Sequence, residues 1–315
     1  MTVKSHFLSK RKALAGLLLA VFAQLGASQV YAAGEVKAVA TFSILGDLVR
    51  QVGGDRVNLT VLVGAGGDSH VFQSNPAQAR SVGQAQVLFS NGLGYESWVR
   101  RLVQAAKFKG RHVVVSQGIE TLKATDSGGH GHGHAHDEVD PHAWQSVGNV
   151  KRYVKNIADG LCAVDAAGCM EYRRNEQSYQ AELDRLEAEI RVAWESVPIE
   201  QRKVITSHDA FGYYARAYQV RFLAAQGTST SAEATTKGVA RLVRQIKAEG
   251  VKALFVESIS DPRLIEQVGR ETGIKPSGTL FSDSLSQSDD SASSYAALMR
   301  HNTRVLVTAV QGKGR

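Results

Sequence analysis

Residues 171–196, "EYRRNEQSYQAELDRLEAEIRVAWES", decide the fold, because their apolar side chains follow the repeat of one long amphipathic helix. The repeat spaces these side chains three, four or seven residues apart: Tyr172, Tyr179, Leu183, Leu186, Ile190 and Trp194. Pro198 follows and predicts the end of the helix, because proline disfavours helical backbone in the residue before it. We expect residues 172–197 to connect two parts of the chain.

Strand and helix patterns alternate on both sides of this connector. Apolar runs bounded by turn residues predict four strands before it, at residues 35–42, 56–64, 86–92 and 111–118. Similar runs predict four strands after it, at residues 203–206, 220–227, 251–258 and 304–310. Such alternation is typical of mostly parallel sheets. The predicted fold class is α/β, with an N-terminal lobe at 33–171 and a C-terminal lobe at 198–315.

The first 32 residues have the order of a secretory signal peptide. A basic segment, residues 4–12, precedes the apolar run 13–27, and Val30 and Ala32 predict cleavage after Ala32. No cysteine lies near this point, so we expect no lipid at the mature N-terminus. Loss of four basic residues lowers the formal net charge from +7 to +3, so nucleic acid is not an expected partner. The mature chain is predicted to be periplasmic.

Two cysteines, Cys162 and Cys169, fall in the exported part, where an oxidising compartment favours a disulfide. Seven residues of unbroken helix rise roughly 10 Å, beyond the Cα separation of about 7 Å that a disulfide spans. A bridge therefore requires a turn between them, which Asp165 and Gly168 permit. Two free thiols are the alternative, and no nearby partners support a metal site at these cysteines.

Four residues with metal-binding side chains follow predicted strands or lie in loops that open helices: His70, His142, His208 and Asp283. Open parallel sheets bind ligands at the carboxyl ends of their strands. Three neutral imidazoles and one carboxylate suit a tetrahedral Zn²⁺ site. Each residue alone also fits a structural role, a hydrogen-bonded histidine or, for Asp283, a helix N-cap. Spacing alone does not bring the four together.

A Gly/His-rich stretch at residues 126–139 holds four more histidines: His130, His132, His134 and His136. It has no apolar periodicity and is predicted to be a mobile loop. Ordering such a segment around an ion costs conformational entropy that a rigid pocket does not lose. We therefore interpret it as an accessory metal loop, and expect His142, after Asp140-Pro141, to be the essential ligand.

From about Lys37 to the C-terminus, the chain resembles the zinc/manganese-binding solute proteins of ATP-binding-cassette (ABC) importers. The matching segments, in order, include "ATFSILGDLVRQVGGDRV", "GGDSHVFQSNPAQ", "NGLGYESWV", "DPHAW", "SHDAFGYYARAY", "GVKALFVES" and "LFSDSLS". The resemblance implies two α/β lobes joined by one long rigid helix, with the metal in the cleft between them. It also implies four metal ligands: His70, His142, His208 and Asp283. Gln73 stands where the family usually has glutamate, which leaves the ligand set unchanged.

The third ligand bears on the choice of metal. In the family that the chain resembles, zinc-binding members have histidine at the position of His208, and many manganese-binding members have a carboxylate there. His208 therefore favours Zn²⁺ over Mn²⁺, in agreement with the donor preferences of the two ions. The ligands must be deprotonated, so affinity is expected to fall as the pH drops. Three acidic residues are candidates to hydrogen-bond the ligand side chains from outside the metal site: Asp140, Asp209 and Glu257.

The resemblance further implies a protein that is not an enzyme and that works with the permease and ATPase of a metal importer. A monomer is expected, and a periplasmic metallochaperone would be a second kind of partner. The stiff connector should limit hinge closure, so we expect metal release through local loop rearrangement. Two other functions are alternatives: a periplasmic zinc hydrolase, which needs an open position for water, and an adhesin or stress buffer that binds many ions.

Overall fold

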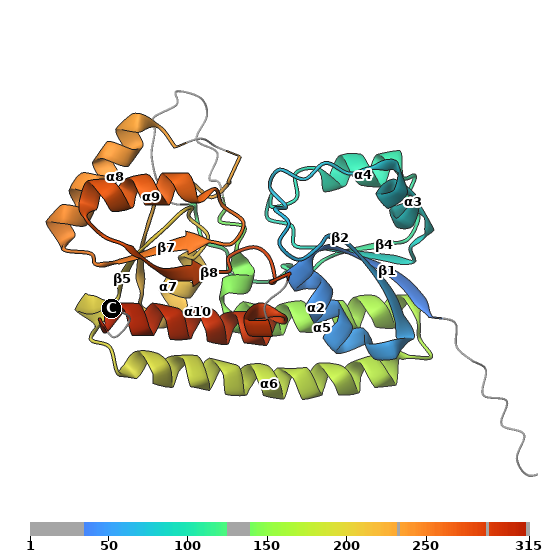
Figure 1. Cartoon of the computed structure of the whole chain (residues 1–315). Coiled ribbons are helices and arrows are strands. Elements are labelled where there is room, and N and C mark those ends of the chain that lie inside the picture. The colour runs from blue at the N-terminus through green and yellow to red at the C-terminus, as the bar shows by residue number, and fades with distance from the viewer. Residues whose placement is uncertain (1–34, 125–138, 232–233, 288–289, 313–315) are drawn as a thin grey trace, which may run out of the picture. The chain divides into compact units, whose positions relative to one another are not determined.

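The computed structural model describes residues 35–124, 139–231, 234–287 and 290–312, and Figure 1 shows two lobes beside one long helix. The N-terminal lobe has a four-stranded parallel sheet of order β2-β1-β3-β4. Its strands are β1 (Val36–Phe42), β2 (Val57–Val63), β3 (Val87–Ser90) and β4 (Arg111–Val114). Its helices are α2 (Ser43–Gly53), α3 (Pro76–Gln84), α4 (Val99–Ala105) and α5 (Val147–Val164), with short 3₁₀ turns η2 (Gly54–Arg56) and η3 (Ala143–Gln145).

The C-terminal lobe repeats this plan with a parallel sheet of order β6-β5-β7-β8. Its strands are β5 (Lys203–Thr206), β6 (Arg221–Ala224), β7 (Ala253–Glu257) and β8 (Pro276–Leu280). Its helices are α7 (Gly212–Tyr218), α8 (Thr236–Glu249), α9 (Pro262–Thr272) and α10 (Tyr295–Val310), with 3₁₀ turns η4 (Ile199–Gln201) and η5 (Asp290–Ala292). In both sheets the first strand of the lobe is central, so the chain reverses its winding direction there.

The connector is α6 (Cys169–Glu195), which runs beneath both sheets in the view of Figure 1. It packs against α2 and α5 of the N-terminal lobe and against α10 of the C-terminal lobe. The six apolar side chains that predicted this helix are its buried residues. The expected fold class, two α/β lobes joined by one long helix, is confirmed.

The turn predicted between the two cysteines is present, and a disulfide joins Cys162 in α5 to Cys169 at the start of α6. Asp165 shapes this turn: Oδ1 accepts the backbone N–H of Gly168 at 3.1 Å, and Oδ2 pairs with the guanidinium of Arg56 at 2.9 Å. The start of the connector is thus bonded to both α5 and η2.

The strand predicted at residues 304–310 is wrong, because these residues form the second half of α10. Val305 and Val307 favour a strand by intrinsic propensity. However, Leu298, Asn302 and Leu306 recur at helical spacing and are buried, so packing against α6 and β8 decides the structure. The fourth strand of this sheet is β8, whose short sequence "PSGTL" has little apolar pattern.

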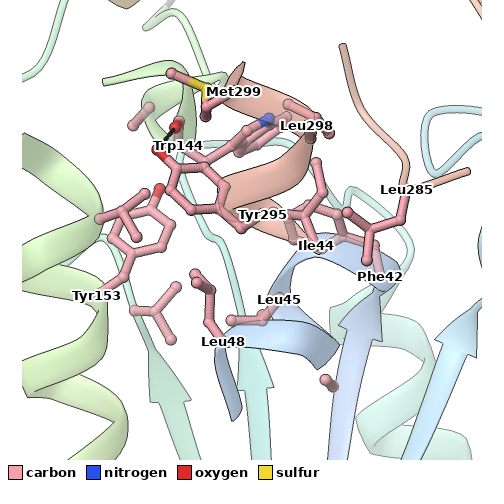
Figure 2. Close-up of a cluster of buried hydrophobic side chains, with 14 of the residues drawn as sticks. Phe42, Ile44, Leu45, Leu48, Trp144, Tyr153, Leu285, Tyr295, Leu298 and Met299 are labelled. Carbon is pink, nitrogen blue, oxygen red and sulfur yellow. Dashed lines mark hydrogen bonds between the residues drawn. The ribbon is translucent and has the colours of Figure 1, made fainter. Parts of the chain in front are cut away.

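One hydrophobic cluster extends through both lobes. Figure 2 shows Tyr295, Leu298 and Met299 of α10 beside Trp144 and residues of β1 and α2. The hydroxyl of Tyr295 donates to the carbonyl oxygen of Trp144 at 2.9 Å. A second, separate cluster is formed largely by α8, α9 and their neighbouring strands. The two lobes therefore share one continuous core.

Candidate metal-binding site

His70 lies in the loop that follows β2, at the carboxyl edge of the N-terminal sheet. Asp68 Oδ1 accepts the backbone N–H of His70 at 2.8 Å and so fixes the turn that carries the ring. The ring packs edge-on against Tyr95, with 4.9 Å between centroids. Burial raises the pKa of the Tyr95 hydroxyl well above its usual value, so this neighbour is neutral. Nε2 of His70 lies 3.1 Å from Asp283 Oδ2.

His142 directly precedes η3, in the loop that opens α5. Asp140 holds it twice with one oxygen: Oδ1 accepts the backbone N–H at 2.9 Å and lies 2.8 Å from Nδ1 of the ring. The side chain of His142 is fully buried. Because Nδ1 faces Asp140, the ring presents Nε2 to Asp283, whose Oδ1 is 3.7 Å away. A carboxylate on the far nitrogen of a histidine ligand orients the ring and raises its basicity.

His208 follows β5 in the C-terminal lobe and is held in a similar way by Glu257, at the end of β7. Glu257 Oε1 accepts the backbone N–H of His208 at 2.9 Å, and Oε2 lies 2.6 Å from Nδ1. Thr206 Oγ1 donates to the carbonyl oxygen of His208 at 3.1 Å. Nε2 of His208 lies 3.2 Å from Asp283 Oδ2. The two contacts of Glu257, with the backbone and with Nδ1 of His208, therefore direct Nε2 of this ring toward Asp283.

Asp283 lies after β8, in a segment bonded to the N-terminal lobe. Gly66 has a φ of +74°, in the left-handed region that favours glycine, and its N–H donates to Ser284 Oγ at 2.7 Å and Leu285 O at 3.0 Å. Ser43 Oγ accepts the N–H of Leu285 at 3.0 Å and lies 3.1 Å from Ser284 Oγ. Although Asp283 follows a C-terminal strand, these bonds fix its backbone to the loop after β2 and to α2.

Two further donors of the N-terminal lobe hold the residue before Asp283. Trp144 Nε1 and Gln145 Nε2 both donate to the carbonyl oxygen of Ser282, at 2.9 and 2.7 Å. Both donors belong to η3, directly after His142. The position of Asp283 is therefore coupled to that of His142 through the backbone of Ser282.

The four predicted residues converge: His70, His142, His208 and Asp283 each offer a ligand atom, and these atoms all lie within 4.8 Å of one another. The side chain of His70 is 5% exposed and the other three are fully buried. Four atoms of these residues are buried without a hydrogen-bond partner: Nε2 of His142, Nδ1 and Nε2 of His208, and Oδ1 of Asp283. Nδ1 of His208 faces Glu257 Oε2, and the other three face the centre of the group. Buried polar atoms normally have partners, so their convergence fits a cation as the missing partner.

Burial and charge act in opposite directions on the two central ionisable groups. Burial lowers the pKa of His208, but the negative charges of Glu257 and Asp283 outweigh it and raise this pKa well above its usual value. Burial raises the pKa of Asp283, but the charges of His208 and His142 outweigh it and hold this pKa well below its usual value. Without a metal, His208 is therefore protonated beside an ionised Asp283, and a cation would replace that proton.

The other predicted residues lie elsewhere. His130, His132, His134 and His136 fall in the range 125–138, outside the described residues. Asp140 and Glu257 contact the rings of His142 and His208 as expected, whereas Asp209 uses its backbone N–H to bond Gly227 O at 3.1 Å. Sequence reasoning missed the residues that hold the Asp283 segment from the N-terminal lobe: Ser43, Gly66, Trp144 and Gln145. A sequence signal existed only for Trp144 and Gln145, which adjoin His142.

Known proteins resemble this chain along most of its length. The profile of the family described as "Zinc-uptake complex component A periplasmic" matches residues 38–309. The chain belongs to this family. It is therefore a substrate-binding protein of an ABC-type metal importer, which acts outside the cytoplasm with a permease and an ATPase, and it is not an enzyme.

Similar proteins carry the names of several metals. The chain is 30% identical over 301 residues to the manganese ABC transporter substrate-binding lipoprotein PsaA of Streptococcus anginosus, covering 91% of this chain and 96% of the relative. It is also 30% identical over 306 residues to the iron ABC transporter substrate-binding lipoprotein MtsA of Streptococcus pyogenes, covering 93% and 96%. These names agree on metal transport and differ on the metal.

Solved structures give the same result. The periplasmic zinc-binding protein TroA from Treponema pallidum superposes with a TM-score of 0.80 at 28% identity, covering 88% of this chain and 99% of that one. The Mn-bound periplasmic metal-binding protein from Candidatus Liberibacter asiaticus gives 0.78 at 27% identity, with the same coverage. These likenesses support the two-lobed fold and a metal-binding role.

Proposed function

We propose that this protein captures Zn²⁺ outside the cytoplasmic membrane and delivers it to its ABC importer, with His70, His142, His208 and Asp283 as ligands. The convergence of three buried imidazoles on one carboxylate carries this proposal. Zn²⁺ takes such donors at about 2.0–2.2 Å, which places tetrahedral ligand atoms roughly 3.3–3.6 Å apart. The present limit of 4.8 Å needs only a small inward movement to reach that geometry.

Mn²⁺ is the second candidate, because similar proteins carry its name. Manganese prefers oxygen donors and octahedral coordination, whereas imidazole suits zinc. Asp283 is the only carboxylate in the four-residue group, and its two oxygens lie close to three imidazole nitrogens. The donor set therefore favours Zn²⁺.

A direct metal titration tests this proposal. The metal-stripped protein is expected to bind one Zn²⁺ with nanomolar or higher affinity against a competing chelator, and Mn²⁺ much more weakly. Deletion of residues 126–139 should leave this tight site intact, whereas His142→Ala should abolish it. Loss of the tight site on deletion, with His142→Ala harmless, would assign binding to the accessory loop and reject the proposal.

Zinc affinity is expected to rise with pH through the neutral range. The pKa of His208 in the metal-free protein is raised, so a proton must leave this ring before Nε2 binds the ion. At pH values below that pKa, each displaced proton makes the dissociation constant fall about tenfold for every unit by which the pH rises. Titrations at several pH values, with proton release followed in weak buffer, measure this slope. A dissociation constant independent of pH would contradict the protonated state of His208.

The export route also belongs to the proposal. We propose that the chain is cleaved after Ala32 and works as a periplasmic monomer, loaded with metal directly or by a metallochaperone. We also propose that its domains are the N-terminal lobe at 33–171, the connector at 172–197 and the C-terminal lobe at 198–315. The named relatives are lipoproteins, whereas this chain has no cysteine before Cys162. Within the described residues, no helix has the length and apolar character needed to cross a membrane. The intact mass of the exported protein tests the cleavage point.

A further inference from the structure

The three histidines of the site share one local device. In each, a carboxylate accepts the backbone N–H of the histidine: Asp68 for His70, Asp140 for His142 and Glu257 for His208. The carboxylates of His142 and His208 also lie against Nδ1 of the same ring, at 2.8 and 2.6 Å. In these two cases backbone and ring are held by one acid within one lobe.

His70 departs from this pattern. Asp68 Oδ1 accepts its backbone N–H, but the other oxygen, Oδ2, accepts a hydrogen bond from Thr230 Oγ1 at 2.6 Å. In the described part of the chain, no carboxylate lies at ion-pair distance from Nδ1 of His70. Thr230 belongs to the C-terminal lobe, in the segment between β6 and α8. The support of His70 is therefore shared between the two lobes.

This shared hydrogen bond lies beside a groove. Asp68 and Thr230 both line a groove of about 810 Å³, together with Val71 and residues near and on α9. The side chain of His70 is also the most exposed of the four, at 5% against none for the others. The bonds from Ser43 to the Asp283 segment are, by contrast, buried. Breaking the Asp68–Thr230 bond therefore requires no disruption of the core.

We infer that the Asp68–Thr230 hydrogen bond is a latch that couples the ligand His70 to the C-terminal lobe and controls the rate of metal release. While the latch is closed, Asp68 is fixed at both oxygens and holds the backbone of His70 against Asp283. When the segment that carries Thr230 moves away, Asp68 turns freely, His70 loses its support, and the ion leaves through the groove. Asp68 and Thr230 are positioning residues, and this inference rests on the proposed zinc site.

Thr230→Val tests the latch, because valine keeps the shape of threonine and removes the hydroxyl. The hydrogen bond has a charged acceptor, so its loss is expected to raise the zinc dissociation rate about tenfold, with the association rate nearly unchanged. Thr230→Ser keeps the donor and should behave as the wild-type protein. Thr236→Val, an exposed threonine at the start of α8, is the matched control. Release is measured by stopped-flow mixing of the zinc-loaded protein with excess chelator.

A double-mutant cycle separates the latch from a general effect on the segment. In an Asp68→Ala background, Thr230→Val should cause no further acceleration. Additive effects, an unchanged rate in Thr230→Val, or equal acceleration by Thr236→Val would overturn the latch. The melting temperature of the metal-free Thr230→Val protein should match the wild type. If the wild-type protein itself binds no zinc tightly, the proposed function fails instead, so the two failures are distinguishable.

Discussion

Asp283→Asn is expected to weaken zinc binding by more than about 100-fold, beyond the roughly 10–100-fold that loss of an outer partner of a ligand causes. Asparagine keeps the size of the side chain and removes its charge. Asp283 is the fully buried carboxylate on which the three imidazoles converge, and its oxygens lie 3.1 to 3.7 Å from their Nε2 atoms. Without it, the bound dication would be surrounded by neutral rings in a buried site.

Chelator competition measures this effect, with circular dichroism of the metal-free protein to verify the fold. Asp184→Asn is the control, because Asp184 is 61% exposed, lies on α6, and forms an ion pair only with Lys151 among the described residues. This control should retain the wild-type dissociation constant. A change of less than tenfold in Asp283→Asn would show that Asp283 is not a ligand, and would return its carboxylate to a structural role.

Much of the fold follows from local sequence patterns. The connector was predictable because its six buried side chains keep helical spacing over many turns, so one periodicity dominates. Seven of the eight strands, all but β8, lie within predicted runs rich in apolar residues, and β1, β3 and β7 are almost wholly buried, as expected for strands covered on both faces. The strand predicted at residues 304–310 was wrong because Val305 and Val307 have a strand propensity that packing of α10 on α6 and β8 overrides.

The candidate ligands could be proposed from the sequence, but their arrangement could not. His70, His208 and Asp283 follow strands, and parallel strands end at one edge of each sheet. No local pattern states that Ser43 bonds Ser284, because 241 residues separate them and each is an ordinary small polar residue. The same holds for Asp68 and Thr230, which are 162 residues apart. Contacts across the lobes depend on how the two sheets pack against the shared core.

Trp144 is the residue that most directly joins this core to the site. Its ring is fully buried and packs against the rings of Phe42, Tyr95 and His142, with centroids 5.1, 4.7 and 5.3 Å away. Its Nε1 donates to the carbonyl oxygen of Ser282, next to Asp283. One side chain therefore contributes both to the packing of rings around His142 and to the position of Asp283.

Replacing Trp144 separates these two contributions. Trp144→Ala is expected to lower the free energy of unfolding of the metal-free protein by about 3–5 kcal/mol, because a large buried ring is lost. Trp144→Phe keeps much of the packing and loses the hydrogen bond to Ser282. Its zinc dissociation rate should rise about fivefold, which is the effect of losing one neutral hydrogen bond. The increase is no larger because Gln145 still donates to the same oxygen of Ser282.

Chemical denaturation measures the first effect and release into chelator the second. Trp194→Phe is the matched control. Trp194 lies at the C-terminal end of the connector, is also buried, and donates a hydrogen bond through Nε1 to the hydroxyl of Tyr214 instead of to the site. It should lose some stability and release zinc at the wild-type rate. If Trp144→Phe and Trp194→Phe release zinc equally fast, then Asp283 is positioned without Trp144. Faster release in Trp144→Phe alone would instead show that the N-terminal lobe controls a ligand that follows a C-terminal strand.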